Sequence, residues 1–248
     1  MDFTGSLVDG FRATLRIVDG PSGVNGFVGY LPSTSTVFVV FRGSENVENW
    51  VVDADLRKTV YPFCEGCEVH EGFLRAHEHV IPLVKAETGR LLKATNSSNL
   101  VITGHSLGAA IATLVTVDLQ TYFNTTKTSM YNFGSPRLFN IVAAEKVSSF
   151  LVDKYRFTHF NDLIPHFPFL MEHYEHITPE IYEDLEGNLH NCVGPEDKSC
   201  AQQWPLEWLG FLAHYFYLDV VMLCPVLTGK NTHSSFGALA SSCKLKTG

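Results

Sequence analysis

The chain has 248 residues, a length that suits one α/β domain better than two smaller ones. Hydrophobic residues make up 45% of it and charged residues 18%, so a packed core is expected rather than disorder. The formal net charge of -8 argues against binding a nucleic-acid backbone or an anionic membrane surface, and it favours neutral substrates.

Five short runs rich in β-branched and aromatic residues are predicted to form strands: Gly26–Tyr30, Val37–Phe41, Leu100–Thr103, Ser129–Phe133 and Tyr155–Phe160. Three longer stretches are predicted to form helices: Gly72–Leu92, Leu107–Tyr122 and Ile141–Leu151. Pro82 and Gly89 are expected to kink or divide the first helix. This alternation predicts an α/β fold with a largely parallel sheet and helices on its faces. Such sheets bind ligands at the carboxyl ends of their strands, where site residues are therefore sought.

The six cysteines fall into three consecutive pairs: Cys64 with Cys67, Cys192 with Cys200, and Cys224 with Cys243. Three disulfides in a secreted protein are preferred over a redox Cys-x-x-Cys motif. A zinc site is not expected, because no second close cysteine pair with histidine spacing completes a metal shell.

Other sequence features indicate whether the protein is secreted or inserted in a membrane. The sequons at Asn96 and Asn124 agree with secretion. Met1–Gly20 lacks the uninterrupted apolar run of a signal peptide, so a mature or trimmed chain is expected. The longest apolar segment, Leu206–Leu223, is broken by a histidine and an aspartate, and no integral membrane segment is predicted.

The stretch VITGHSLGAAIATLV, Val101–Val115, places a serine between a buried-strand run and a helix rich in alanine and leucine. A tight strand–turn–helix at Ser106 leaves no room for neighbouring side chains, which explains Gly104 and Gly108. Such a turn exposes the hydroxyl and aims the first helical N–H groups, that of Leu107 included, at a developing oxyanion. The competing interpretation makes Ser106 an ordinary N-cap. The flanking strand and helix favour a nucleophile.

A serine nucleophile needs a histidine base and an orienting carboxylate, and α/β-hydrolases carry them in the order serine, acid, histidine. Asp162 directly follows the predicted strand Tyr155–Phe160 and therefore lies at its carboxyl end. Other aspartates fit less well because they lie in a helix, before a strand or in polar loops: Asp118, Asp153, Asp184 and Asp197. Asp162 is the predicted acid.

Six histidines follow this aspartate: His166, His173, His176, His190, His214 and His233. Any of them could have a structural role, as most histidines do. His214, in LGFLAHYFYL, is the one polar group of an aromatic, apolar patch, as a base beside an apolar substrate would be. It is preferred as the base, with His176 as the alternative.

With these motifs in place, the chain resembles the fungal-type class 3 lipases, the Rhizomucor and Thermomyces lipase family, over nearly all its length. The matching pieces follow one another in family order: FRGS at Phe41–Ser44, ENW at Glu48–Trp50, CEGCEVHEGF at Cys64–Phe73, TGHSLG, FGSPR at Phe133–Arg137, NDLIPHFP at Asn161–Pro168, HITPEIY at His176–Tyr182 and HYFY at His214–Tyr217. The elbow alone is shared by many hydrolases, whereas the ordered set is specific.

The resemblance implies an α/β-hydrolase fold and a triad of Ser106, Asp162 and His214. It implies that Ser44 and Leu107 donate backbone N–H groups to the oxyanion, and that His176 is structural. The implied activity is a secreted triacylglycerol lipase that forms an acyl-enzyme, with no metal or organic cofactor. Its expected partner is neutral lipid at an oil–water interface, with no nucleic acid, and a monomer is expected.

Some positions depart from the family pattern. Ala109 and Phe139 stand where glycines are usual, and Ile181-Tyr182 replaces a Tyr-Trp pair, so pocket shape is left open. The family's N-terminal helix, whose cysteine bonds near the C-terminus, has no counterpart here. Cys224 and Cys243 are therefore expected to pair with each other.

A short lid is predicted within Glu45–Leu56, because four residues form one apolar helical stripe at i, i+3, i+4 and i+7: Val47, Trp50, Val51 and Ala54. This apolar flap favours a lipase over a feruloyl esterase of the same family, whose flap is polar. A phospholipase stays an alternative. A non-catalytic lipid-binding module is disfavoured, because all three triad residues are present.

Overall fold

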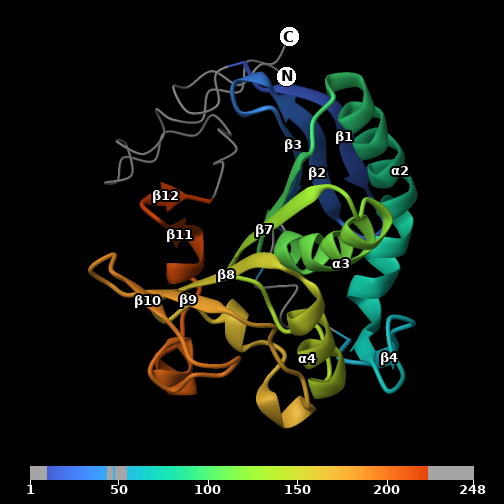
Figure 1. Ribbon diagram of the computed structural model, residues 1–248. Coiled ribbons are helices and arrows are strands. Elements are labelled where there is room, and N and C mark those ends of the chain that lie inside the picture. Colours follow the sequence, from blue (N-terminus) through green and yellow to red (C-terminus); the bar gives the residue numbers. More distant parts are fainter. Residues whose placement is uncertain (1–9, 44–46, 48–54, 223–248) are drawn as a thin grey trace.

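A computed structural model describes residues 10–43, 47 and 55–222 of the protein (Figure 1). Its main sheet has eight strands within these ranges: β1 (Arg12–Asp19), β2 (Val24–Leu31), β3 (Thr36–Arg42), β6 (Asn99–His105), β7 (Lys127–Phe133), β8 (Asp153–His159), β9 (Glu180–Glu183) and β10 (Leu189–Asn191). Their spatial order is β1-β2-β3-β6-β7-β8-β9-β10. Strands β3 to β9 of this order run parallel, and β1, β2 and β10 extend the sheet in antiparallel fashion.

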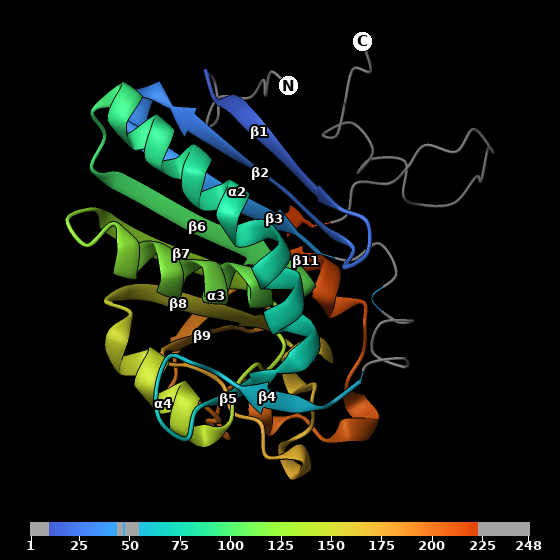
Figure 2. The ribbon, with the colours of Figure 1, turned by 90° about the vertical axis from the view of Figure 1, so that its right-hand side faces the viewer.

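Three long helices lie on the same side of the sheet in both views of the ribbon (Figures 1 and 2). They are α2 (Glu71–Thr95), α3 (Leu107–Tyr122) and α4 (Ile141–Phe150). On the other side, the short hairpin of β11 (Phe216–Tyr217) and β12 (Val220–Val221) approaches β8 (Figure 1). The fold is that of an α/β-hydrolase, with a mostly parallel sheet flanked by helices.

Helix α3 has a sequence that is apolar almost all round, and every residue from Leu107 to Val117 is buried. Ala109, Ala110 and Ile111 have no exposed surface, and such a helix can only be stable inside a core. It packs between α2 and the central strands, against buried side chains of β6 such as Leu100 and Ile102. The nucleophile candidate is thereby attached to the most buried helix described.

The sequence-predicted strands and helices correspond to β2, β3, β6, β7, β8, α2, α3 and α4, with α3 matched at both ends. Sequence reasoning missed β1, which is an edge strand. Its outward positions are exposed and include Arg12 and Arg16, so its apolar alternation is weak. It also missed β9 and β10, which are short.

Helix α2 is undivided, although Pro82 and Gly89 lie inside it. Of the two outcomes expected at these residues, a kink or a division, the division is therefore wrong. Pro82 lies on the exposed face, and so does Glu78 four residues before it. The carbonyl of Glu78, which loses its helical donor at Pro82, can therefore be hydrated.

Two of the three predicted disulfides lie within the described residues, and both are formed. Cys64–Cys67 closes the turn between β4 (Lys58–Val60) and β5 (Glu68–His70). Cys192–Cys200 closes a loop after β10. The predicted Cys224–Cys243 pair lies outside the described residues. Among the described helices, none combines the length and apolar character needed to cross a bilayer.

Replacing Pro82 by alanine is expected to raise the free energy of unfolding by about 1–3 kcal/mol. The substitution restores an N–H donor in a helix interior, and the greater freedom of the unfolded chain offsets part of the gain. Urea unfolding measures the change. Glu78→Ala on the same exposed face is the control and should shift stability by less than about 0.5 kcal/mol. Destabilisation by Pro82→Ala would show that the proline ring packs usefully in the native helix.

Candidate active site

Ser106 lies at the sharp turn between β6 and α3, with φ 59° and ψ -131°. A positive φ is costly for a residue with a side chain and persists only where the surroundings enforce it. Here the Ser106 N–H donates to the carbonyl of Phe133 on the neighbouring strand, at 2.9 Å. The Ser106 hydroxyl makes no capping hydrogen bond to the helix. Ser106 thus occupies the N-cap position of α3, but its hydroxyl does not cap the helix.

The small residues around this turn are required by close backbone contacts. A Cβ on Gly104 would lie 2.3 Å from the carbonyl oxygen of Gly108. A Cβ on Gly108 would lie 2.6 Å from the carbonyl oxygens of both Phe41 and Arg42, at the end of β3. Side chains at either position would push α3 away from the sheet, as the sequence analysis expected.

Of the two predicted oxyanion donors, Leu107 lies within the described residues and Ser44 does not. Leu107 is the first residue of α3, so its N–H has no acceptor within the helix and points outward from the helix N-terminus. Ser44 lies outside the described residues, but its neighbour Gly43 is described: a Cβ there would lie 2.9 Å from the Cβ of Ser106. The end of β3 thus lies directly against the candidate nucleophile.

Of the four stripe residues of the predicted lid, the structure describes one, Val47. Val47 is buried, with 3% of its surface exposed. The other stripe residues lie outside the described residues: Trp50, Val51 and Ala54.

Asp162 follows the carboxyl end of β8 and is 1% exposed. Its Oδ2 lies 2.8 Å from Nδ1 of His214 and accepts a hydrogen bond from the hydroxyl of Tyr217 at 2.6 Å. Its Oδ1 accepts the N–H of Ile164 at 2.8 Å. A buried carboxylate is tolerated when its oxygens are paired in this way. Asp162 is therefore held in one orientation, facing His214.

The competing aspartates are engaged elsewhere. Their partners are His77 for Asp118, Ser129 for Asp153, His190 and Asn188 for Asp184, and Ser199 and Val193 for Asp197.

His214 lies in the 3-10 turn η6 (Ala213–Tyr215) and has no exposed surface. Because a carboxylate only accepts hydrogen bonds, Nδ1 of His214 carries the proton and Nε2 is left as the basic atom. Among the described residues, neither Nε2 of His214 nor Oγ of Ser106 has a hydrogen-bond partner, and both atoms are buried. Hydrogen bonds between a nucleophile and its base are often long without substrate and shorten when it binds.

The alternative base, His176, lies in a different environment. It is 5% exposed, and its Nε2 donates to the carbonyl of Pro165 at 2.7 Å. Burial, with the nearby charges of Arg156 and Arg137, lowers the pKa of His176 well below its usual value. This histidine has the surroundings of a structural residue. His233 lies outside the described residues.

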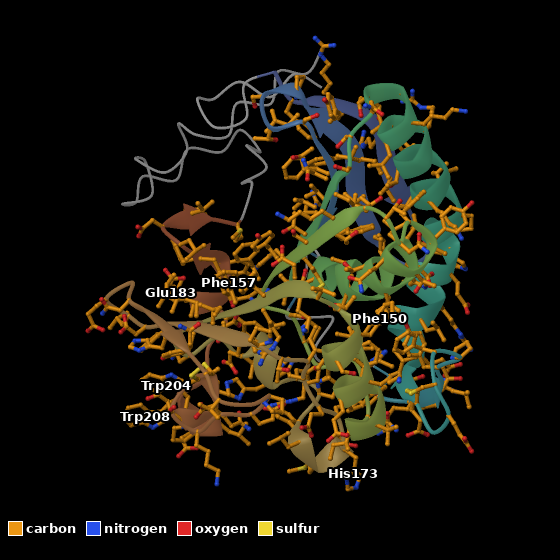
Figure 3. The ribbon with its side chains drawn as sticks, in the orientation of Figure 1. Phe150, Phe157, His173, Glu183, Trp204 and Trp208 are labelled. Atoms are coloured by element: carbon orange, nitrogen blue, oxygen red, sulfur yellow. A yellow bond between two sulfur atoms is a disulfide. The ribbon has the colours of Figure 1, made fainter. Side chains whose placement is uncertain are left out.

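The site includes a residue that the sequence analysis did not single out. Tyr217 is buried, and burial together with the charge of Asp162 raises the pKa of its hydroxyl well above the usual value. It therefore stays a neutral donor to Asp162. Its hairpin is anchored where the Leu218 N–H donates to the carboxylate of Glu183 on β9, at 2.9 and 3.1 Å. Glu183 is labelled in Figure 3. The sequence feature that could have indicated Tyr217 is its position three residues after His214, within HYFY.

In the part of the chain that the structure describes, no three histidine, cysteine, aspartate or glutamate side chains are grouped as a metal site would require. The arrangement itself brings together a serine hydroxyl at a strained turn, an imidazole and a buried carboxylate. In serine hydrolases such a set of groups performs acyl transfer through a covalent intermediate.

Comparisons with known proteins show that this chain is similar to lipases. A family model described as lipase (class 3) matches residues 38–172. The secreted mono- and diacylglycerol lipase 1 of Fusarium solani is 33% identical over 182 residues, which are 73% of this chain and 52% of that protein. The chain spans about half to three fifths of the length of such curated relatives, for example 60% of a Penicillium cyclopium lipase.

Solved structures of lipases are also similar to this chain. Lipase II from Rhizopus niveus superposes with a TM-score of 0.80 at 26% identity, covering 85% of this chain and 81% of that one. A triacylglycerol lipase in which a serine protease triad forms the catalytic centre gives a TM-score of 0.79 at 26% identity, covering 86% and 82%.

Tyr217→Phe is expected to lower the free energy of unfolding by about 1–3 kcal/mol, because it leaves an oxygen of buried Asp162 with one donor fewer. It should also slow the reaction of Ser106 with a p-nitrophenyl alkylphosphonate, since His214 then depends on a less rigid carboxylate. Chemical denaturation and the release of p-nitrophenol measure the two effects. Tyr174→Phe, whose hydroxyl donates to the Leu56 carbonyl, is the matched control. Equal phosphonylation rates for wild type and Tyr217→Phe would remove Tyr217 from the site.

Proposed function

Since the chain belongs to the class 3 lipase family, we propose that it is a serine carboxylester hydrolase that cleaves neutral acylglycerols. Ser106 is its nucleophile, His214 its base and Asp162 the orienting acid. The observation that carries the proposal is the buried pair of Asp162 and His214, 2.8 Å apart, beside a serine held at positive φ.

In the proposed mechanism, Nε2 of His214 takes the proton of the Ser106 hydroxyl while Oγ attacks the ester carbonyl. The resulting oxyanion accepts hydrogen bonds from the backbone N–H groups of Leu107 and Ser44. His214 then gives its proton to the leaving alcohol, and an acyl-enzyme remains on Ser106. Water, activated by His214, attacks this ester in the same way and releases the fatty acid.

Asp162 acts on His214 in two ways in this scheme. Its carboxylate fixes the imidazole in the tautomer with the proton on Nδ1, so that Nε2 faces the nucleophile. It also stabilises the imidazolium that forms when His214 takes the serine proton. The donors from Tyr217 and Ile164 hold the carboxylate in place, so no reorientation is needed during the reaction.

Triacylglycerols are the proposed main substrates. The neutral acylglycerol fits the acidic chain, with its net charge of -8, and the apolar stripe of the proposed flap. Hydrolysis of mono- and diacylglycerols is the second candidate, because the Fusarium solani relative is named for those substrates. Feruloyl ester and phospholipid hydrolysis are further alternatives within the same chemistry.

The proposed location is extracellular, and the proposed active species is a monomer with one α/β-hydrolase domain. Two disulfides among the described residues are of the kind that persists in oxidising compartments. The sequon residues Asn96 and Asn124 are both exposed, as glycosylation requires. The Fusarium solani relative is named as a secreted lipase.

Parallel assays on emulsified triglyceride, diglyceride, phosphatidylcholine and methyl ferulate test this function. We expect the fastest hydrolysis with triglyceride. Ser106→Ala and His214→Ala should each lower kcat by roughly four orders of magnitude or more while the protein stays folded. His176→Ala is the comparison for the base. Near-normal activity of His214→Ala together with an inactive, folded His176→Ala would reverse the assignment of the base.

A second prediction concerns the segment Glu45–Leu56, proposed to contain a lid that opens on lipid. A two-turn helix is unstable unless its apolar face is buried, either in the protein or in lipid. Each large side chain transferred contributes about 1.5–3 kcal/mol, so lipid can shift the balance between closed and open states. Trp50 is the proposed main anchor, since an indole suits a half-hydrated interface.

Activity should therefore rise abruptly when a short-chain triglyceride passes its solubility limit. Trp50→Ser should reduce this rise more than it slows hydrolysis of a soluble ester. The measurement is the initial rate as a function of triglyceride concentration across the limit. A smooth saturation curve that Trp50→Ser leaves unchanged would mean that this segment is not a lid.

A further inference from the structure

Two histidines outside the triad bind consecutive carbonyls of the turn that carries His214. His105, the last residue of β6, places its Nε2 2.8 Å from the carbonyl oxygen of His214. His159, the last residue of β8, places its Nδ1 3.0 Å from the carbonyl oxygen of Ala213. Carbonyl oxygens only accept hydrogen bonds, so both imidazoles must donate. The proton of His105 is therefore on Nε2, and that of His159 is on Nδ1.

The rings of these histidines also contact the site. The His105 ring lies 4.4 Å from the His214 ring between centroids, with 32° between their planes. Tyr217, the donor to Asp162, lies with its ring 5.9 Å from His105 and 5.7 Å from His159. The two histidines therefore contact the turn through its carbonyls and contact Tyr217 through their rings.

The turn itself is poorly held by local structure. It is a single 3-10 turn, closed by the bonds from His214 N–H to Phe211 O and from Tyr215 N–H to Leu212 O. Such short 3-10 segments have weak hydrogen-bond geometry and are not stable alone. Leu212, just before the turn, is 70% exposed. Backbone bonds hold the flanks of this turn, from Leu163 N–H to Gly210 O and from Met222 N–H to Tyr215 O. Between these flanks, the carbonyls of Ala213 and His214 are bound by side chains at the ends of two sheet strands.

We propose that His105 and His159 are positioning residues, a two-histidine clamp that holds the turn of His214 in register with Ser106 and Asp162. The clamp rests on the proposed function for its catalytic meaning, because it acts only through His214. Its two members reach the turn from the ends of β6 and β8, the strands that also lead to Ser106 and Asp162.

The charge state of His105 suits this role. Burial first, and then the neighbouring His214, lower the pKa of His105 to about 3, while Asp162 opposes the shift. The ring is therefore neutral at the pH where His214 takes up the proton of Ser106. A cationic ring at this centroid distance would repel the imidazolium that forms on His214. A neutral donor holds the turn without that cost.

Substitutions that keep or remove the donor test the clamp. In His105→Gln the amide nitrogen lies near the former Nε2, and in His159→Asn it lies near the former Nδ1. His105→Phe and His159→Phe keep a ring but donate nothing. We expect the phenylalanine variants to lower kcat roughly 10- to 100-fold with little change in KM, because a small displacement of a catalytic group has effects of this size. The glutamine and asparagine variants should recover most of the rate.

A second measurement separates positioning from stability. The proton between His214 Nδ1 and Asp162 gives a far-downfield NMR signal, which should broaden or shift in His105→Phe and His159→Phe and persist in the donor-keeping variants. His77→Phe is the matched control, because His77 is a buried histidine between α2 and α3, 3.0 Å from Asp118. It should lose stability while kcat and the downfield signal stay unchanged. If His105→Phe does not fold, the His159 pair of variants decides the question.

Wild-type kcat and an unchanged downfield signal in the phenylalanine variants would overturn the clamp. Equal losses in His105→Gln and His105→Phe would overturn it as well, since the donor would then be irrelevant. If the wild-type chain hydrolyses none of the esters, the proposed function fails, and the NMR signal still decides whether the two histidines hold His214.

Discussion

The closeness of α3 to the end of β3 is the constraint on which the rest of the site depends. Gly108 is in contact with the carbonyls of Phe41 and Arg42, and Gly104 is in contact with the carbonyl of Gly108. This approach forces the chain through a positive φ at Ser106 and brings the first N–H of α3 beside the residue that follows β3. The strain of the turn is offset by the packing of α3, whose residues from Leu107 to Val117 are all buried.

The buried pair of Asp162 and His214 is the second demanding feature. Removing two ionisable groups from water is costly, and burial of such a pair is tolerated only when the remaining polar atoms are satisfied. Tyr217 and the N–H of Ile164 satisfy the carboxylate. The imidazole keeps one buried nitrogen without a partner among the described residues. That nitrogen, Nε2, is the atom that takes the proton in the proposed chemistry. The one buried polar atom of the pair that lacks a hydrogen bond is therefore the reacting atom.

Sequence reasoning located the triad candidates because each follows a local rule: glycines around a serine, an aspartate just after a strand, and a lone histidine in an apolar run. It identified the central strands for the same reason, since their buried runs are continuous. It missed the edge strand β1, most of whose exposed positions are polar, and it expected Pro82 to kink or divide α2, which continues through this residue undivided. The roles of Tyr217, His105 and His159 depend on contacts between segments more than 50 residues apart, which no local pattern contains.

The bond from His105 to the carbonyl of His214 has a mechanical consequence. His105 and Ser106 are consecutive residues, so one peptide unit carries both the nucleophile and the contact that restrains the base. In the proposed enzyme, a displacement of the end of β6 would move nucleophile and base together and would largely preserve the spacing between them. The chain that leads into the base turn is exposed at Leu212, by 70%, whereas the carbonyls of the turn itself are bound to the ends of β6 and β8. The proposed lipase, which would act at a fluid and irregular substrate surface, would gain from a reacting pair held together in this way.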